Sequence, residues 1–232
     1  MRQKFARTNA FIVVMLFFIL GSTLLLEACA RKEMSTLQKD KSPTPVLVFG
    51  DSLSAGFGVR KGLEWPVLLE ERMKERGILS KEQSVANYSK SGEDTKGGLK
   101  RFQNALDETQ PSLIVLELGG NDALRRQSME NTEKNLQQMI TMGQKSGAQV
   151  ILVGADLPEK LFFISAKHFT SVFERLSEKN DIVLVPNILK GVNGKREYMQ
   201  DDTIHPNAEG QPVMLDNVWP AVEESLNKKP AP

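Results

Sequence analysis

The sequence predicts an α/β protein with three layers, in which a central parallel sheet of five strands lies between two layers of helices. The first observation is a set of short, continuous apolar runs, which are typical of strands buried on both faces. The second is that stretches with apolar residues at helical spacing lie between these runs. Each parallel crossover needs a helix, and right-handed crossovers place helices on both faces of the sheet.

The strands and helices are predicted to alternate along the chain. The expected strands are Val46 to Phe49, a weaker Ser84 to Tyr88, Leu113 to Leu118, Val150 to Val153 and Ile182 to Val185. The helical stripes run from Trp65 to Met73, Leu99 to Leu106, Leu136 to Gly143, Phe169 to Leu176 and Leu215 to Leu226. We interpret these stripes as core, and we expect Pro220 to bend or interrupt the last helix.

The N-terminal segment differs in composition from the rest of the chain. Arg2, Lys4 and Arg7 precede the largely apolar residues 11–26, a pattern typical of a secretion signal. A single-pass membrane anchor is the alternative, because this stretch is only slightly shorter than a membrane span. Small residues at its end favour cleavage.

Two modes of cleavage remain open. Ala28-Cys29-Ala30 suits ordinary signal peptidase, whereas residues 26–29 resemble the bacterial lipoprotein box, with the only cysteine of the chain in the acylated position. We expect a signal peptide over residues 1–28, a lipid-attachment cysteine and flexible tether over 29–45, and one domain over 46–232. Export would then end on the periplasmic side. An outer-membrane lipoprotein is favoured over a soluble periplasmic or secreted protein.

The overall charge excludes one class of partner. The chain has 30 basic and 29 acidic side chains, so nothing in its net charge of +1 attracts nucleic acid. We expect a monomer that needs no cofactor.

The candidate chemistry lies at three places that the fold brings together. Ser52 follows the first apolar run, Asn121 follows the third, and Asp202 and His205 lie near the C-terminus. Ligands bind at the carboxyl ends of parallel strands, so residues that follow them should share one rim of the sheet. A single turn can bring the carboxylate of Asp202 to the imidazole of His205. We interpret the other histidine, His168, as structural or solvent-facing.

In this pattern the chain resembles the SGNH hydrolases, also called GDSL esterases and lipases, over nearly the whole domain. Four blocks carry the resemblance in order: Gly50-Asp51-Ser52-Leu53-Ser54, Asn87 to Gly92, Gly119-Gly120-Asn121-Asp122 and Asp202 to Pro206. It implies a flavodoxin-like sheet, Ser52 as nucleophile, His205 as general base and Asp202 as its orienting group. It also implies an oxyanion hole from the amides of Ser52 and Gly92 and the side chain of Asn121.

Simpler roles exist for each of these residues. Ser52 could cap a turn, Gly92 end a strand, Asn121 bond its own loop, and Asp202 cap the last helix. Four such coincidences would have to occur together, which favours the catalytic interpretation. Asp202 and His205 alone lack the further ligands that a metal ion needs, so we expect no metal site.

Within the family, the chain is most similar to bacterial thioesterases that are also arylesterases and lysophospholipases. This resemblance implies hydrolysis of acyl thioesters, aryl esters and lysophospholipids, with the acyl chain in a groove on the sheet rim. Candidate groove residues are Leu157, Pro158, Leu161, Phe162, Phe163 and Ile164, although the same run could be a buried helix start. The alternative functions are a carbohydrate O-acetylesterase and a non-catalytic, lipid-binding surface lipoprotein.

Overall fold

The computed structural model describes residues 45–156 and 166–227, and five parallel strands in the order β2-β1-β3-β4-β5 form its sheet. The strands are β1 (Val46–Gly50), β2 (Val85–Asn87), β3 (Leu113–Glu117), β4 (Gln149–Val153) and β5 (Val183–Val185). All neighbouring strands in this order pair in parallel. The predicted parallel sheet is therefore confirmed, and each strand boundary lies within one residue of its expected position.

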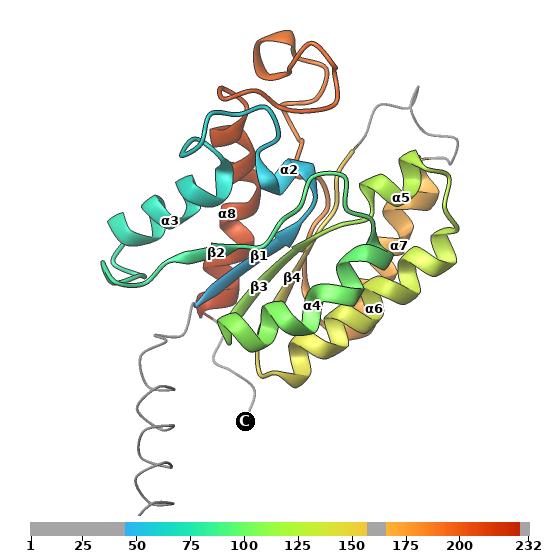
Figure 1. Cartoon of the computed structure of the whole chain (residues 1–232), viewed down its shortest axis with the longest axis horizontal. Helices are drawn as coiled ribbons and strands as arrows, with labels where there is room; N and C mark the ends of the chain where they lie inside the picture. Colours follow the sequence, from blue (N-terminus) through green and yellow to red (C-terminus); the bar gives the residue numbers. More distant parts are fainter. Residues whose placement is uncertain (1–44, 157–165, 228–232) are drawn as a thin grey trace, which may run out of the picture. The chain divides into compact units, whose positions relative to one another are not determined.

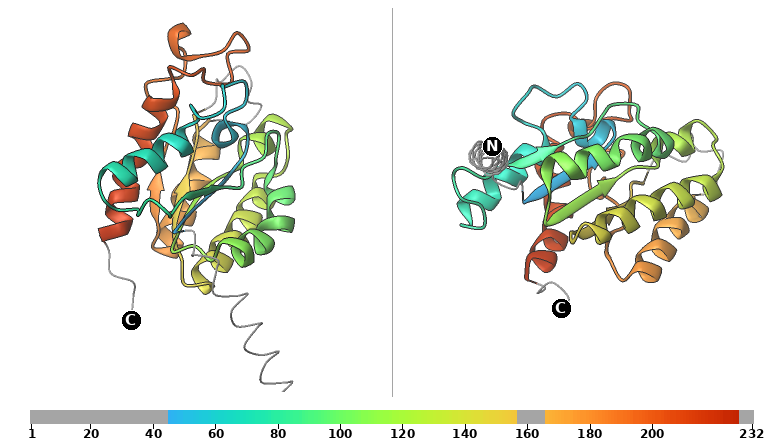
Figure 2. Two further views of the ribbon diagram at one scale, coloured as in Figure 1. Left: turned by 60° about the vertical axis from the view of Figure 1, so that its left-hand side comes forward. Right: turned by 60° about the horizontal axis from the view of Figure 1, so that its bottom comes forward.

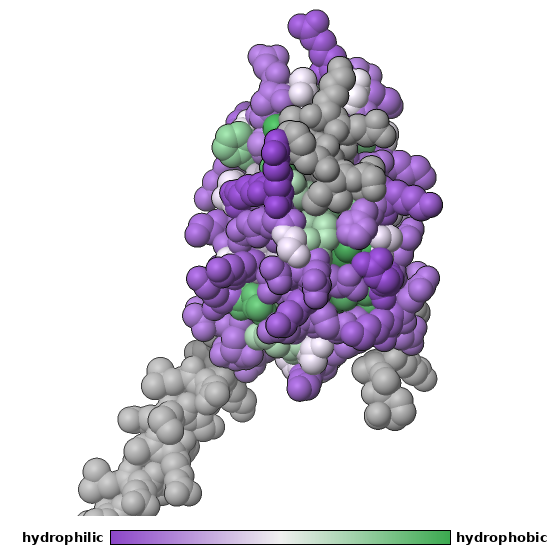
Figure 3. Space-filling view, turned by 90° about the vertical axis from the view of Figure 1, so that its right-hand side faces the viewer, coloured by the Kyte–Doolittle hydropathy of each residue, from purple (hydrophilic) through white to green (hydrophobic). Residues whose placement is uncertain are grey.

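Helices cover both faces of the sheet (Figures 1 and 2). One layer contains α3 (Trp65–Glu75) and α8 (Gln211–Asn227), and the other contains α4 (Thr95–Thr109), α6 (Met129–Lys145) and α7 (Ala166–Asn180). The outward surface over the second layer is mostly hydrophilic (Figure 3). Each helix thus turns its apolar stripe toward the sheet, as the sequence predicts.

The alternation of side chains along β1 shows how the two layers are joined. Val46 and Val48 belong to the core under α3 and α8, whereas Leu47 and Phe49 belong to the core under α4, α6 and α7. All four are fully buried. Phe49 meets Phe102 of α4 edge to face, with ring centroids 4.9 Å apart. A central strand buried on both faces is a rigid support for the segment that follows it.

Of the bend or interruption expected at Pro220, the interruption does not occur. The helix is continuous from Gln211 to Asn227 with Pro220 inside it. A proline removes the hydrogen bond to the carbonyl four residues earlier, which belongs to Asp216. Both residues lie on the exposed side of the helix, where water can satisfy that carbonyl.

Three short helices were not predicted. They are α2 (Ser52–Ala55), α5 (Gly120–Leu124) and the 3-10 helix η2 (Arg196–Tyr198). The first two begin immediately after β1 and shortly after β3, at the carboxyl rim of the sheet. No helix in residues 45–156 or 166–227 is both long and apolar enough to cross a membrane.

Candidate active site

Ser52 is the first residue of the short helix α2, which follows β1. Asp51 caps this helix, because its carboxylate accepts a hydrogen bond from the amide of Leu53 at 3.1 Å. The fully buried strand β1 fixes the position of Asp51, and the cap fixes the first turn of α2. The Ser52 hydroxyl is thereby held at the rim of the sheet.

A tight turn places His205. The backbone amides of Ile204 and His205 both donate to Oδ1 of Asp202, each at 2.9 Å. Thr203, between Asp202 and Ile204, has a φ of 60°, in the left-handed region that favours glycine. This turn brings the Asp202 carboxylate to the imidazole ring, with Oδ2 at 2.6 Å from Nδ1. Asp202, not the adjacent Asp201, is the aspartate that meets the histidine.

The other ring nitrogen of His205 faces the serine. Its Nε2 lies 2.9 Å from Oγ of Ser52, although 153 positions separate the two residues in the chain. Partial burial opposes ionisation of Asp202, but hydrogen bonds from the His205 amide, its ring and the Ile204 amide outweigh it and lower the pKa of Asp202. A carboxylate at Nδ1 keeps the proton on that nitrogen and leaves Nε2 as a proton acceptor.

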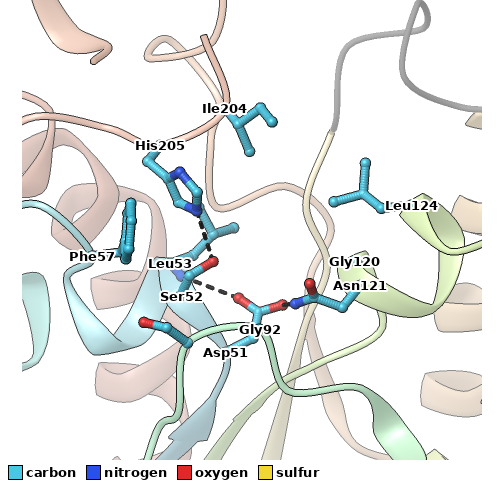
Figure 4. A pocket seen from close by; sticks show the side chains of 11 residues that line it. Asp51, Ser52, Leu53, Phe57, Gly92, Gly120, Asn121, Leu124, Ile204 and His205 are labelled. Atoms are coloured by element: carbon cyan, nitrogen blue, oxygen red, sulfur yellow. Dashed lines mark hydrogen bonds between the residues drawn. The ribbon is translucent and has the colours of Figure 1, made fainter. Parts of the chain in front are cut away.

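A cavity of about 360 Å³ opens beside Ser52. Gly92 lies on its wall with a φ of 75°, which a side chain would strain, and its carbonyl accepts from Nη2 of Arg125 at 2.7 Å. The Asn121 amide lies on the same side of Ser52 as Gly92 (Figure 4). The residues that line the cavity are Asp51, Ser52, Leu53, Phe57, Ser91, Gly92, Gly120, Asn121, Leu124, Ile204 and His205.

Apolar side chains form the upper walls of this cavity. Phe57 lies on the side of His205, with ring centroids 4.6 Å apart, and Leu124 lies on the side of Asn121 (Figure 4). Phe57 is 49% exposed. A polar floor with apolar walls suits a substrate that joins a polar reacting group to an apolar chain.

Asn121 is held from below by a buried acid. Its Nδ2 donates to Oδ2 of Asp51 at 2.9 Å, and Asp51 is only 3% exposed. Burial raises the pKa of Asp51 to about 6, against the opposing effect of the hydrogen bonds from Leu53 and Asn121. One N–H of the Asn121 amide is engaged in this way, and the amide has a second N–H to donate.

The structure brings Ser52, Gly92, Asn121 and His205 to one cavity and Asp202 to the outer side of the histidine. The candidate groove residues Leu157, Pro158, Phe162 and Phe163, like Cys29, lie outside the described residues. His168 lies on the exposed face of α7.

Sequence reasoning missed the residues that support the site. Phe57 and Gln200 join the serine and histidine segments: Gln200 Nε2 donates to the carbonyls of Phe57 at 2.6 Å and Pro206 at 2.9 Å. Glu117 lies under Asp51. Its role had one indication in the sequence: it is the only charged residue in a strand that is otherwise apolar. In the described part of the chain, no three His, Cys, Asp or Glu residues are grouped closely enough to hold a metal ion.

Comparison with known proteins gives consistent matches. The sequence pattern of the GDSL-like lipase/acylhydrolase family matches residues 48–213. Esterase TesA from Pseudomonas aeruginosa is 36% identical over 203 residues, which cover 88% of this chain and 98% of that protein. Thioesterase 1/protease 1/lysophospholipase L1 from Escherichia coli is 34% identical over 171 residues, which cover 74% and 79%. A crystal structure of TesA matches with a TM-score of 0.73 at 37% identity, covering 78% of this chain and 98% of that one.

Proposed function

The chain belongs to the GDSL-like lipase/acylhydrolase family and is a serine hydrolase of ester and thioester bonds, and we propose that Ser52, His205 and Asp202 carry its reaction. The observation that supports these roles is the unbroken line of contacts from Asp202 through His205 to Ser52, at 2.6 and 2.9 Å.

The reaction begins with proton transfer from Ser52 to His205. As Oγ attacks the carbonyl carbon of the substrate, Nε2 takes the hydroxyl proton, and the Asp202 carboxylate stabilises the imidazolium that forms. The carbonyl oxygen becomes an oxyanion. The amides of Ser52 and Gly92 and the second N–H of Asn121 stabilise that charge without adding a charge of their own.

Collapse of this intermediate expels the alcohol or thiol. His205 returns the proton to the leaving oxygen or sulfur, and the acyl group stays on Ser52 as an ester. Water then attacks the acyl-enzyme, with His205 as base again, and releases the carboxylic acid. Thioesters and oxygen esters follow the same path because only the leaving atom differs.

We further propose acyl thioesters, aryl esters and lysophospholipids as substrates. The apolar walls formed by Phe57, Leu124 and Ile204 support an apolar acyl or aryl group more than a sugar. The E. coli relative is named both a thioesterase and a lysophospholipase. Acyl-length preference should be measured with nitrophenyl esters from acetyl to palmitoyl.

The test uses the full chain and its Ser52→Ala variant. Rates that rise beyond acetyl and vanish in the variant support the lipid acyl hydrolase. An optimum at acetyl would favour the carbohydrate O-acetylesterase, and turnover that survives Ser52→Ala would remove Ser52 from the mechanism. Ester turnover absent in both proteins would favour a non-catalytic lipoprotein.

We also propose that the enzyme is an exported monomer held on the periplasmic side of a membrane through an acylated Cys29. The support is the sequence alone: a basic start, an apolar stretch and a sole cysteine after Ala28. Anchoring would keep the enzyme beside its lipid substrates. Labelled palmitate should enter the protein in a bacterial host, and Cys29→Ala should release it from the membrane fraction. Failure of both would contradict lipidation.

A further inference from the structure

Two buried carboxyl groups lie directly under the nucleophile. Asp51 is 3% exposed and Glu117 is 2% exposed. Glu117 ends β3, and in the sheet it pairs with Gly50, the last residue of β1. Among the described residues, no lysine or arginine forms an ion pair with either group. Buried carboxylates are usually paired with a cation, so this arrangement requires an explanation.

The Glu117 side chain is fitted closely to the nucleophile segment. Its Oε2 accepts a hydrogen bond from Oγ of Ser54 at 2.8 Å and lies 3.4 Å from the amide of Asp51. A Cβ on Gly50 would lie only 2.7 Å from Oε2 of Glu117. Glycine at position 50 therefore leaves the space that this carboxyl group occupies.

The hydrogen bonds indicate which group is ionised. The Asp51 carboxylate accepts from two N–H donors, on Leu53 and Asn121, and such donors favour the charged form. Burial and then the charge of Asp51 raise the pKa of Glu117 well above its ordinary value, and its hydrogen bond to Asp51 adds to the effect. Two buried carboxyls in contact cannot both ionise readily, so they retain one proton between them.

Two other charged groups shift the pKa of Asp51. His205, across the cavity, lowers the pKa of Asp51, and Asp122 of α5 raises it. After burial, the charge of Asp51 is the largest contribution to the raised pKa of Glu117. At neutral pH the pair therefore carries a single negative charge, on Asp51.

We propose that Glu117 is a positioning residue for acyl transfer: as a neutral acid it donates a hydrogen bond to Asp51, and the Asp51 carboxylate holds the Asn121 amide beside Ser52. This inference rests on the proposed role of Asn121 as an oxyanion donor. Neutral Glu117 has two effects on the site. Its hydrogen bond holds the Asp51 carboxylate in place. Because it is neutral, it also adds no second negative charge beneath the oxyanion.

The first test is the pH dependence of stability. A group whose pKa is raised in the folded state contributes stability below its unfolded pKa, here 4.5, and that contribution is lost as pH rises toward the folded pKa. Glutamine cannot lose this proton. The stability of the unaltered protein should therefore fall with rising pH relative to that of Glu117→Gln. The ratio of the folding constant of Glu117→Gln to that of the unaltered protein should grow between pH 5 and 8, by up to about tenfold per pH unit.

Urea unfolding at several pH values measures this ratio. Ser54→Ala is the matched control, because it removes the hydrogen bond at 2.8 Å but keeps the ionisable group. Its stability should fall at all pH values and should still decrease as pH rises, because Glu117 remains ionisable and loss of the Ser54 hydrogen bond raises its pKa further. A ratio for Glu117→Gln that does not change with pH would overturn the neutral state of Glu117.

The second test is rescue by the conservative side chain. Glutamine can donate to Asp51 and leucine cannot, so Glu117→Gln should keep kcat within about threefold. Glu117→Leu should lower kcat by about 10- to 100-fold with little change in KM, because donor geometry acts on the transition state. Glu70→Leu is a control at a distance: Glu70 accepts from the Val85 amide and Lys74, away from the cavity, and its loss should leave kcat unchanged.

Equal kcat for the leucine and glutamine variants would overturn the positioning role. If Glu117→Leu does not fold, the urea experiment with Glu117→Gln still decides the protonation state. The proposed function is tested separately by Ser52→Ala. An inactive Ser52→Ala protein together with equal activities of the Glu117 variants would refute only this inference.

Discussion

Gln200→Met is the substitution that most directly tests how the segment containing Ser52 and the segment containing His205 are held at a fixed distance. The Gln200 side-chain amide donates to the carbonyl of Phe57, five residues after Ser52, and to that of Pro206, next to His205. Its own amide also donates to the His205 carbonyl at 2.8 Å. Methionine has a similar length and no donor, so it removes only the two side-chain hydrogen bonds.

The expected loss of stability is modest. A neutral hydrogen bond contributes about 0.5 to 1.5 kcal/mol, so two contribute about 1 to 3 kcal/mol. The hydrogen bond to the Phe57 carbonyl is exposed, so water can replace part of the lost interaction, which favours the lower half of that range. Activity should fall further than stability suggests, because displacing a reacting group by about 1 Å can cost about 100-fold in rate. We expect kcat to fall by about 10- to 100-fold.

The assay is hydrolysis of nitrophenyl butyrate, with kcat and KM measured separately, beside urea unfolding of the same protein. Gln144→Met is the matched control. Gln144 donates to the backbone carbonyl of Asn180 at 3.0 Å, in the helical layer away from the cavity. That variant should lose some stability and keep its kcat. If Gln200→Met loses stability but its kcat stays within twofold, Gln200 does not set the distance between Ser52 and His205.

Three further outcomes are expected. Asn121→Ala should lower kcat by about 100- to 1,000-fold with KM nearly unchanged, which steady-state kinetics can check; a change confined to KM would contradict an oxyanion role. Phe57→Ala should reduce kcat/KM for octanoyl esters more than for acetyl esters, and an equal reduction would remove Phe57 from the acyl site. Gly98→Ala places a Cβ 2.6 Å from Cδ1 of Leu118, so urea unfolding should show a loss of about 1 to 3 kcal/mol, and unchanged stability would mean that the core relaxes freely.

The sheet and its helical layers were predictable because their signal is local. A strand such as Leu113–Glu117 is buried on both faces, so nearly all of its residues are apolar and the strand can be recognised in the sequence. The short helices after β1 and β3 were not predictable in this way. Four or five residues are too few to show a helical period, and their start depends on a cap, as at Asp51.

The contacts that support the site were harder to predict from the sequence for a different reason. Asp51 and Glu117 are 66 positions apart, and Asp51 and Asn121 are 70 apart. Their contact depends on the register that places Gly50 beside Glu117, which a single sequence does not specify. The family blocks contain Asp51 and Asn121, but the blocks give no partner for a charged residue at the end of β3.

The pKa values of two aspartates close to Ser52 are shifted in opposite directions, and this difference separates their roles. Hydrogen bonds lower the pKa of the partly exposed Asp202, so its charge is available to the imidazolium over the whole neutral range. Asp51 is buried, with its pKa raised to about 6, so its single charge depends on local donors. If Glu117 also ionised, two carboxylates would lie beneath an oxyanion and repel it. An acid kept neutral by burial is therefore better suited to this position than a second carboxylate, and an alkaline loss of kcat that Glu117→Gln abolishes would be its kinetic signature.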